Sequence, residues 1–294
     1  MVEIKKKKRS TTTKRRNTHT QYKRKNPYHR SGKRNKNNIL LPHGMMKVVR
    51  VVFLVCFFIA FYYFFVRPYA YRWRYIPDRE GYGVCMPVGY KVHGIDISHY
   101  QGTINWTELR NQQLEKYPIR FVFVKATEGS DYADENFEKN FENARKYGFI
   151  RGAYHFYNPD VPALKQADFF ISKVKLGQGD LPPVLDVEKK GFKSKHDLNV
   201  ALKLWLDRVE MHYGVKPIIY ASYKFKEAYL NDSIFDKYPY WIAHYYVDSV
   251  ATNRTWKFWQ HTDIATIPGI KEDVDLNIFN GSLIDLQEMT IGKE

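Results

Sequence analysis

Short apolar runs and amphipathic stretches alternate from Lys91 onward. Eight runs predict strands, at Val92–Ile97, Arg120–Ala126, Ile150–Phe156, Pro183–Val187, Pro217–Ala221, Tyr240–Ala243, Trp256–Gln260 and Val274–Ile278. Stretches with helical spacing lie between them, at Trp106–Tyr117, Glu135–Tyr147, Ala163–Lys175, Lys195–Tyr213 and Lys224–Leu230. Strands separated by helices indicate an α/β fold with a largely parallel sheet.

The longest helical stretch, Lys195–Tyr213, has a stripe of residues at three- and four-residue steps that should face a core, formed by Leu198, Ala201, Leu202, Trp205, Val209 and His212. The segment 91–285 is nevertheless short for a barrel with eight helices, and the gaps between its last three strands are brief. We therefore predict an irregular, helix-poor TIM-like (β/α) barrel over 91–285. A doubly wound open sheet is the alternative.

A long apolar run precedes the barrel. Residues 48–66 contain a single charge, Arg50, near one end. As a helix this run spans roughly 28 Å, which is close to the hydrocarbon thickness of a bilayer. A secretory signal peptide, the rival interpretation, has a shorter apolar region and a small-residue cleavage site. We predict an uncleaved transmembrane anchor, with an aromatic belt on its far side at Tyr69, Tyr71, Trp73 and Tyr75 and a linker over 67–90.

The excess positive charge of the chain is confined to its N-terminus. The first 50 residues hold 17 Lys and Arg and one acid, Glu3, whereas the rest of the chain holds 30 basic and 30 acidic residues. We predict that residues 1–47 form a disordered tail in the cytoplasm, which places the barrel on the extracytoplasmic side. We expect no nucleic-acid partner, because the barrel is balanced in charge and the tail adjoins an anchor. Two cysteines exclude a disulfide-dense scaffold and a Cys-rich zinc site.

The candidate chemistry lies at the ends of the predicted strands, where active sites of such barrels occur. Asp186 and Glu188 share one strand face because side chains at i and i+2 point the same way. Two carboxylates this close resist ionising together, which supplies one acid and one base at the same pH. Closure of the barrel would bring Asp96 on the first strand near Asp275 on the last. A metal pair, or a salt-bridged interior with Lys125, is the alternative.

Aromatic residues at the strand ends favour a sugar over a metal, because flat apolar faces suit sugar rings. They are Tyr100, Tyr154, Tyr220, Trp241, Tyr245 and Trp259. Core packing is the alternative for each of them. Polar residues also end strands, and for His155 and His244 a hydrogen-bonded position behind the pocket is the alternative to ligand contact.

Seven segments, in order along the chain, resemble the glycoside hydrolase family 25 lysozymes (Ch-type N-acetylmuramidases). They are His93–Gly102, Phe123–Gly129, Gly152–Phe156, Val184–Glu188, Pro217–Tyr220, Phe258–Gln260 and Val274–Asn277. The resemblance covers about residues 91–281. It implies a TIM-like barrel that cleaves the β-1,4 bond between N-acetylmuramic acid and N-acetylglucosamine in peptidoglycan, with no metal or organic cofactor.

The resemblance also implies roles for single residues. Glu188 resembles the general acid/base, and Asp186 would steady the substrate's own N-acetyl group as it attacks. Asp96 and Asp275 would complete an acidic floor. The predicted substrate-binding residues are Tyr154, Tyr220, Gln260, Trp259, Tyr100, Lys125 and His155. A peptidoglycan-binding module of the same fold that does not cut, and a metal-dependent hydrolase, are the alternatives.

Overall fold

The computed structural model describes residues 42–66, 81–111, 117–250 and 256–292. Two units are described separately. The first contains most of helix α1 (His43–Phe61), which continues as a π-helical turn η1 (Tyr62–Val66). Within this helix, Gly44–Val66 is long and apolar enough to cross a membrane, with a mean hydropathy of 2.4 and no part buried. Residues 1–41 of the predicted tail, and the predicted belt at 69–75, lie outside the described residues.

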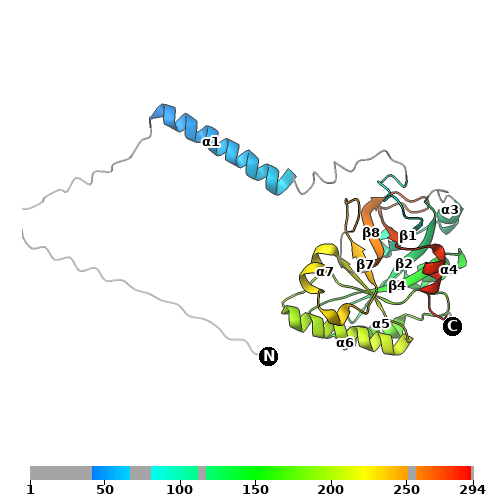
Figure 1. Ribbon diagram of the computed structural model, residues 1–294. Coiled ribbons are helices and arrows are strands. Elements are labelled where there is room, and N and C mark those ends of the chain that lie inside the picture. The colour runs from blue at the N-terminus through cyan, green and yellow to red at the C-terminus, as the bar shows by residue number, and fades with distance from the viewer. Residues whose placement is uncertain (1–41, 67–80, 112–116, 251–255, 293–294) are drawn as a thin grey trace, which may run out of the picture. The chain divides into compact units, whose positions relative to one another are not determined.

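The second unit is a closed barrel of eight strands, as predicted (Figure 1). The strands are β1 (Val92–Ile97), β2 (Ile119–Glu128), β4 (Ile150–Phe156), β5 (Val184–Asp186), β6 (Ile218–Ser222), β7 (Tyr240–Ala243), β8 (Trp256–Ala265) and β9 (Val274–Phe279). Their order is β1-β9-β8-β7-β6-β5-β4-β2, and pairing of β1 with β2 closes the barrel. The sheet is parallel except at β9, which runs antiparallel to β1 and β8. A two-residue strand β3 (Tyr132–Ala133), absent from the predicted elements, pairs with the end of β2.

Aromatic side chains fill the lower interior of the barrel. The ring of Phe123 packs 4.5 Å from Trp241 and 5.1 Å from Phe258, measured between centroids. These rings need space that only glycine provides on the neighbouring strands. A Cβ at Gly94 would lie 2.4 Å from the ring of Phe121, and one at Gly152 would lie 2.5 Å from that of Phe123. The aromatic core closes the interior below the carboxyl ends of the strands.

Six helices are described around this barrel: α3 (Trp106–Asn111), α4 (Phe137–Lys146), α5 (Ala163–Lys173), α6 (Lys195–Tyr213), α7 (Tyr223–Tyr229) and α8 (Leu283–Glu288). Helix α6 begins after Ser194, whose hydroxyl accepts from the backbone N–H of Asp197, and it ends at Gly214 in the left-handed region. Its predicted stripe is buried except for the half-buried Ala201 and for His212, which is exposed in the last turn. Helix α8 was not among the predicted elements.

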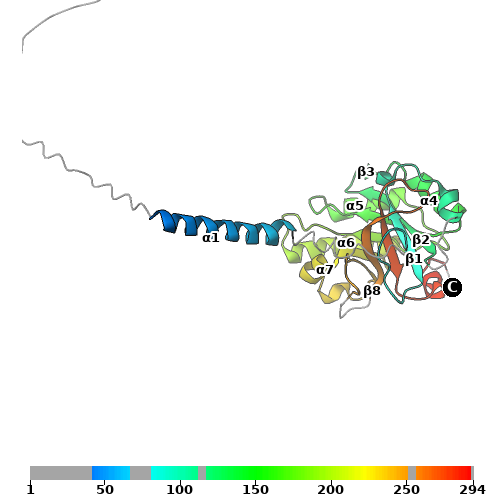
Figure 2. The ribbon, with the colours of Figure 1, turned by 90° about the horizontal axis from the view of Figure 1, so that it is seen from above.

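One side of the barrel has no long helix. In Figure 1, α5 and α6 lie below the barrel and α7 lies at its left, whereas β1 and β8 are at the upper right; Figure 2 shows the same barrel from above. A segment that precedes β1 covers this side. Tyr82 and Val84 are buried, and the Tyr82 hydroxyl donates to the carbonyl of Tyr117 at 2.9 Å. The ring of Tyr90 contacts Trp256 at 5.8 Å. Residues 81–90 of the predicted linker are therefore part of the barrel packing, while 67–80 lie outside the described residues.

Candidate active site

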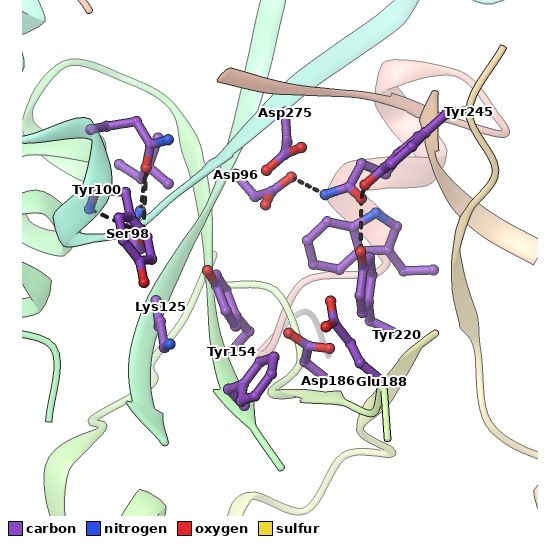
Figure 3. Close-up of a pocket in the computed structure, with 15 residues that line it drawn as sticks. Asp96, Ser98, Tyr100, Lys125, Tyr154, Asp186, Glu188, Tyr220, Tyr245 and Asp275 are labelled. Carbon is purple, nitrogen blue, oxygen red and sulfur yellow. Dashed lines mark hydrogen bonds between the residues drawn. The ribbon is translucent and has the colours of Figure 1, made fainter. Parts of the chain in front are cut away.

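A pocket of about 220 Å³ opens at the carboxyl end of the parallel strands (Figure 3). Its lining residues are Asp96, Ile97, Ser98, Tyr100, Gln101, Lys125, Tyr154, Phe156, Asp186, Glu188, Tyr220, Trp241, Tyr245, Gln260 and Asp275. All four predicted acids are among them, with five of the seven predicted substrate-binding residues. The acids form two pairs, one from β1 and β9 and one from the end of β5.

The first pair is Asp96 and Asp275, which face each other because their strands are paired at these residues. Asp96 is 6% exposed, and its Oδ2 accepts from Gln260 Nε2 at 2.9 Å and from Asn277 Nδ2 at 2.7 Å. Burial raises the pKa of Asp96 to about 6, although the two amides favour its ionised form. Burial, and then the charge of Asp96, raises the pKa of Asp275 to about 9. The pair therefore holds a proton at neutral pH.

The second pair is Asp186, the last residue of β5, and Glu188 two positions later. Val187 between them is buried among the residues of the outer core, so both carboxylates take the opposite side (Figure 3). Asp186 is buried, and its Oδ1 has no hydrogen-bond partner in the described part of the chain. Burial, and then the charge of Glu188, raises the pKa of Asp186 well above its ordinary value.

Glu188 differs from the other three acids because its side chain is exposed to solvent at the pocket. The loss of surrounding water at its carboxyl raises the pKa, and the ammonium groups of Lys189 and Lys125 oppose this rise. A carboxyl that keeps its proton to higher pH and can be reached from the pocket is suited to general-acid work. The arrangement places one solvent-exposed carboxyl beside one buried carboxyl, and the pKa of each is raised.

A hydrogen-bonded network of amides and aromatic residues supports the first pair. Gln260 Oε1 accepts from the hydroxyl of Tyr220 at 2.7 Å and from that of Tyr245 at 2.5 Å. On the other side of Asp96, Asn277 Oδ1 accepts from the indole of Trp241 at 2.8 Å. Both amide nitrogens are thereby directed at Asp96, which fixes the orientation of its carboxylate.

Two predicted substrate-binding residues lie at the edge of the pocket. Tyr100 belongs to the short 3-10 helix η2 (His99–Gln101) and is 73% exposed. Ser98 and Gln101 form a capping box that fixes η2 directly after β1. Lys125 is buried, and its ammonium donates to Glu128 Oε2 at 2.6 Å. An exposed aromatic ring and a fixed cation thus flank the four carboxylates (Figure 3).

His155 and Trp259 do not line the pocket, contrary to the sequence-based prediction. His155 is buried behind β4, where Nδ1 is 2.7 Å from the Thr127 hydroxyl and Nε2 is 3.2 Å from Gln166 Oε1. The indole of Trp259 donates to the carbonyl of His244 at 2.7 Å. Each residue follows or precedes a pocket residue on the same strand, Tyr154 and Gln260, and adjacent strand residues face opposite sides. Both therefore pack in the outer core.

Sequence reasoning did not identify Ser98, Gln101, Ile97 or Phe156 as pocket residues. The alternation that places Tyr154 in the pocket also places Phe156 there, so the signal was present for this residue. Trp241 and Tyr245 stood among the strand-end aromatic residues, and the structure places both at the pocket. No group of three or more His, Cys, Asp or Glu side chains in the described segments has the geometry to hold a metal ion.

The chain is similar in sequence to a known family of enzymes. The family model for glycosyl hydrolases family 25 matches residues 95–270, a range that includes Asp96, Asp186 and Glu188. The protein YegX of Escherichia coli strain K12, which is uncharacterised, is 38% identical over 228 residues, covering 77% of this chain and 83% of its own. Lysozyme M1 of Streptomyces globisporus is 33% identical over 221 residues, covering 70% and 73%.

Solved structures agree with this relationship. The family 25 glycosyl hydrolase of Bacillus anthracis matches with a TM-score of 0.64 and 32% identity, over 70% of this chain and 97% of that one. The match extends over the closed barrel. The chain therefore belongs to the glycosyl hydrolases of family 25 and is a glycoside hydrolase.

Proposed function

We propose that this glycoside hydrolase is a muramidase, which hydrolyses the β-1,4 bond between N-acetylmuramic acid and N-acetylglucosamine in peptidoglycan. The similarity to Lysozyme M1 supports this substrate. The observation that carries the proposal is the pair formed by Asp186 and Glu188, a buried acid beside an exposed one in a sugar-sized pocket. Two carboxyl groups in different environments are what glycoside cleavage requires.

Glu188 is the proposed general acid and base. Its proton passes to the bridging oxygen as the bond from that oxygen to C1 of the muramic acid breaks. The carbonyl oxygen of the substrate's own acetamido group attacks C1 and forms a cyclic intermediate. Ionised Glu188 then takes a proton from water, which opens the ring at C1. Two displacements at the same carbon retain the anomeric configuration.

Asp186 is the proposed partner of the acetamido group. Its Oδ1 is buried and has no described hydrogen-bond partner, so an acetamido N–H could satisfy it. A hydrogen bond there would orient the acetamido group for attack and stabilise the positive charge that develops on it. Asp96 and Asp275 add negative potential beneath the same carbon. Tyr154, Tyr220 and Gln260 supply hydroxyl and amide contacts for the sugar, and Tyr100 and Lys125 extend the site at its edge.

Residues 48–66 are the proposed membrane anchor, with residues 1–47 in the cytoplasm and the barrel on the extracytoplasmic side. The apolar helix Gly44–Val66 and the concentration of basic residues before it support this orientation. The basic tail would then lie on the side where anionic lipids attract it. Peptidoglycan is found on the opposite side, where the barrel would meet it.

Product analysis tests the proposed reaction. Purified peptidoglycan is digested with the full chain in detergent, the new ends are reduced with borohydride, and the fragments are identified by mass spectrometry. A reduced muramic acid residue at every new end is expected. Reduced glucosamine ends would contradict the proposed bond. NMR of the first product should show the β-anomer, and an α-anomer formed first would contradict the acetamido route.

A further inference from the structure

The loop between β5 and α6, Lys189–Ser194, carries an unusual side chain. Phe192 is 98% exposed, although a phenyl ring in contact with water is unfavourable. The loop begins one residue after Glu188 and leads into α6. The pocket residue Phe156 lies 6.0 Å from the Lys189 ammonium, measured to the ring centroid. The loop that carries the exposed ring therefore begins beside the active site.

The loop is held in place by its own contacts. The Lys190 ammonium donates to the carbonyl oxygens of Gly191 and Lys193 at 3.3 and 3.2 Å. Gly191 has a φ of +59°, and a Cβ there would lie 2.7 Å from Asp160 Oδ1 and 2.9 Å from Pro159 Cγ. Only glycine permits this close packing on the neighbouring loop. Phe192 is thus presented on a supported turn, which reduces the entropy that a ligand would have to remove.

The charge of the loop is opposite to that of the pocket. Lysines occupy positions 189, 190, 193 and 195, and residues 189–195 contain no acid. The pocket holds four carboxylic acids, which disfavour an anionic polymer. Peptidoglycan carries free carboxylates on the stem peptides attached to its muramic acid residues. A basic loop beside the acidic pocket matches a ligand whose sugar enters the pocket while its peptide remains outside.

We propose that Phe192 and Lys193 form a binding site for the stem peptide of the muramic acid unit being cleaved, with the ring packing on the peptide's apolar atoms and the ammonium pairing with a carboxylate. This inference rests on the proposed muramidase function. An anionic membrane surface is another ligand that a phenyl ring and lysines would suit. The stem peptide is favoured because the loop is continuous with Glu188 and packs beside the pocket residue Phe156.

The test compares two soluble substrates of equal chain length, peptidoglycan fragments with stem peptides and the same glycan after an amidase has removed them. The full chain is assayed in detergent as wild type, as Phe192→Ala and as Lys193→Gln. Met211→Ala and Lys175→Gln are the matched controls. Met211 is 69% exposed near the far end of α6, and Lys175 is exposed after α5.

Each loop variant is expected to raise KM about tenfold on the peptide-bearing substrate, which corresponds to about 1.4 kcal/mol. KM on the peptide-free glycan and kcat on both substrates should stay within about twofold of wild type, and the controls should behave as wild type. Equal changes on both substrates, or none on either, would overturn the inference while leaving the muramidase function intact. A wild-type chain that cleaves neither substrate would overturn both.

The lipid alternative needs one further arm. The same variants are assayed in nanodiscs of neutral and of anionic lipid. A defect that occurs only in anionic nanodiscs, and equally with both substrates, would assign the loop to the membrane surface and overturn the stem-peptide site. A defect that follows the stem peptide in detergent and in both kinds of nanodisc supports it.

Discussion

The two carboxylate pairs in the pocket differ in how completely the protein itself satisfies them. Asp96 receives two amide hydrogen bonds, and those amides are fixed by Tyr220, Tyr245 and Trp241. Asp186 has an oxygen without a described partner, and Glu188 is open to solvent. Asp96 is thus hydrogen-bonded within the protein, whereas Asp186 Oδ1 has no partner in the described part of the chain. The difference indicates that the first pair sets the local potential, whereas the second pair meets the substrate.

Replacing the exposed acid should cause the greatest loss of activity. Glu188→Gln keeps the size of the side chain but cannot exchange a proton, so kcat should fall about 10³-fold, within the usual range for general acid–base catalysis. The rate on purified peptidoglycan measures this loss. The melting temperature should change little because the side chain is exposed. Activity within a few-fold of wild type would remove Glu188 from the mechanism.

Asp186→Asn should have the next largest effect. The amide can still contact the acetamido group but cannot stabilise its developing positive charge, so kcat should fall about 10²-fold and less than in Glu188→Gln. Activity on peptidoglycan provides the measurement. If Asp186→Asn and Glu188→Gln were equally inactive, separate roles for the two carboxyls would not hold.

Lys125 distinguishes the pairs electrostatically. Its charge lowers the pKa of both Asp186 and Glu188, while it is not among the leading influences on Asp96 or Asp275. In Lys125→Gln the second pair should keep its proton to higher pH. The alkaline limb of the kcat/KM profile should therefore move upward by up to about one pH unit. Lys173→Gln, an exposed lysine at the end of α5, is the control. A downward shift would show that Lys125 acts on another group.

The smallest expected effect is on stability. The folded-state pKa of Asp275 is about 9, above its ordinary value of 3.8, so the folded state holds a proton that the unfolded chain releases between these values. Stability therefore falls as pH rises through this window. Asp275→Asn should remove the loss and stabilise the barrel at pH 8, by about 1–3 kcal/mol, but not at pH 4. Thermal unfolding at both pH values measures this. Equal effects at the two pH values would argue against a raised pKa.

Much of this fold could be predicted because its strands are apolar runs with clear ends. Six of the eight strands begin and end within one residue of the prediction at both ends, and the helix Lys195–Tyr213 matches exactly, as its caps at Ser194 and Gly214 indicate. The strand β3 was missed because two residues carry no periodic pattern. The direction of β9 could not be read from composition, since parallel and antiparallel strands at a closed barrel are equally apolar.

The candidate site shows where the same reasoning fell short. Alternation along a strand placed Asp186 and Glu188 together, but the rule was not applied to Tyr154 with His155 or to Trp259 with Gln260. Adjacent residues cannot both face the pocket, and the structure places one member of each pair behind the barrel wall. The hydrogen-bond network around Asp96 could not be predicted from the sequence. It joins residues from β1, β6, β8 and β9, which only closure of the barrel brings together.

The segment 81–90 has a practical consequence for preparing the enzyme without its apolar helix. A chain shortened to residue 91, where the strand pattern starts, would uncover Trp256 and leave the Tyr117 carbonyl without the Tyr82 hydroxyl. Aggregation during purification is the expected cost of that cut. A chain starting at or before Gly81 keeps this cover, so the safe boundary lies eleven residues ahead of Val92, the first residue of β1.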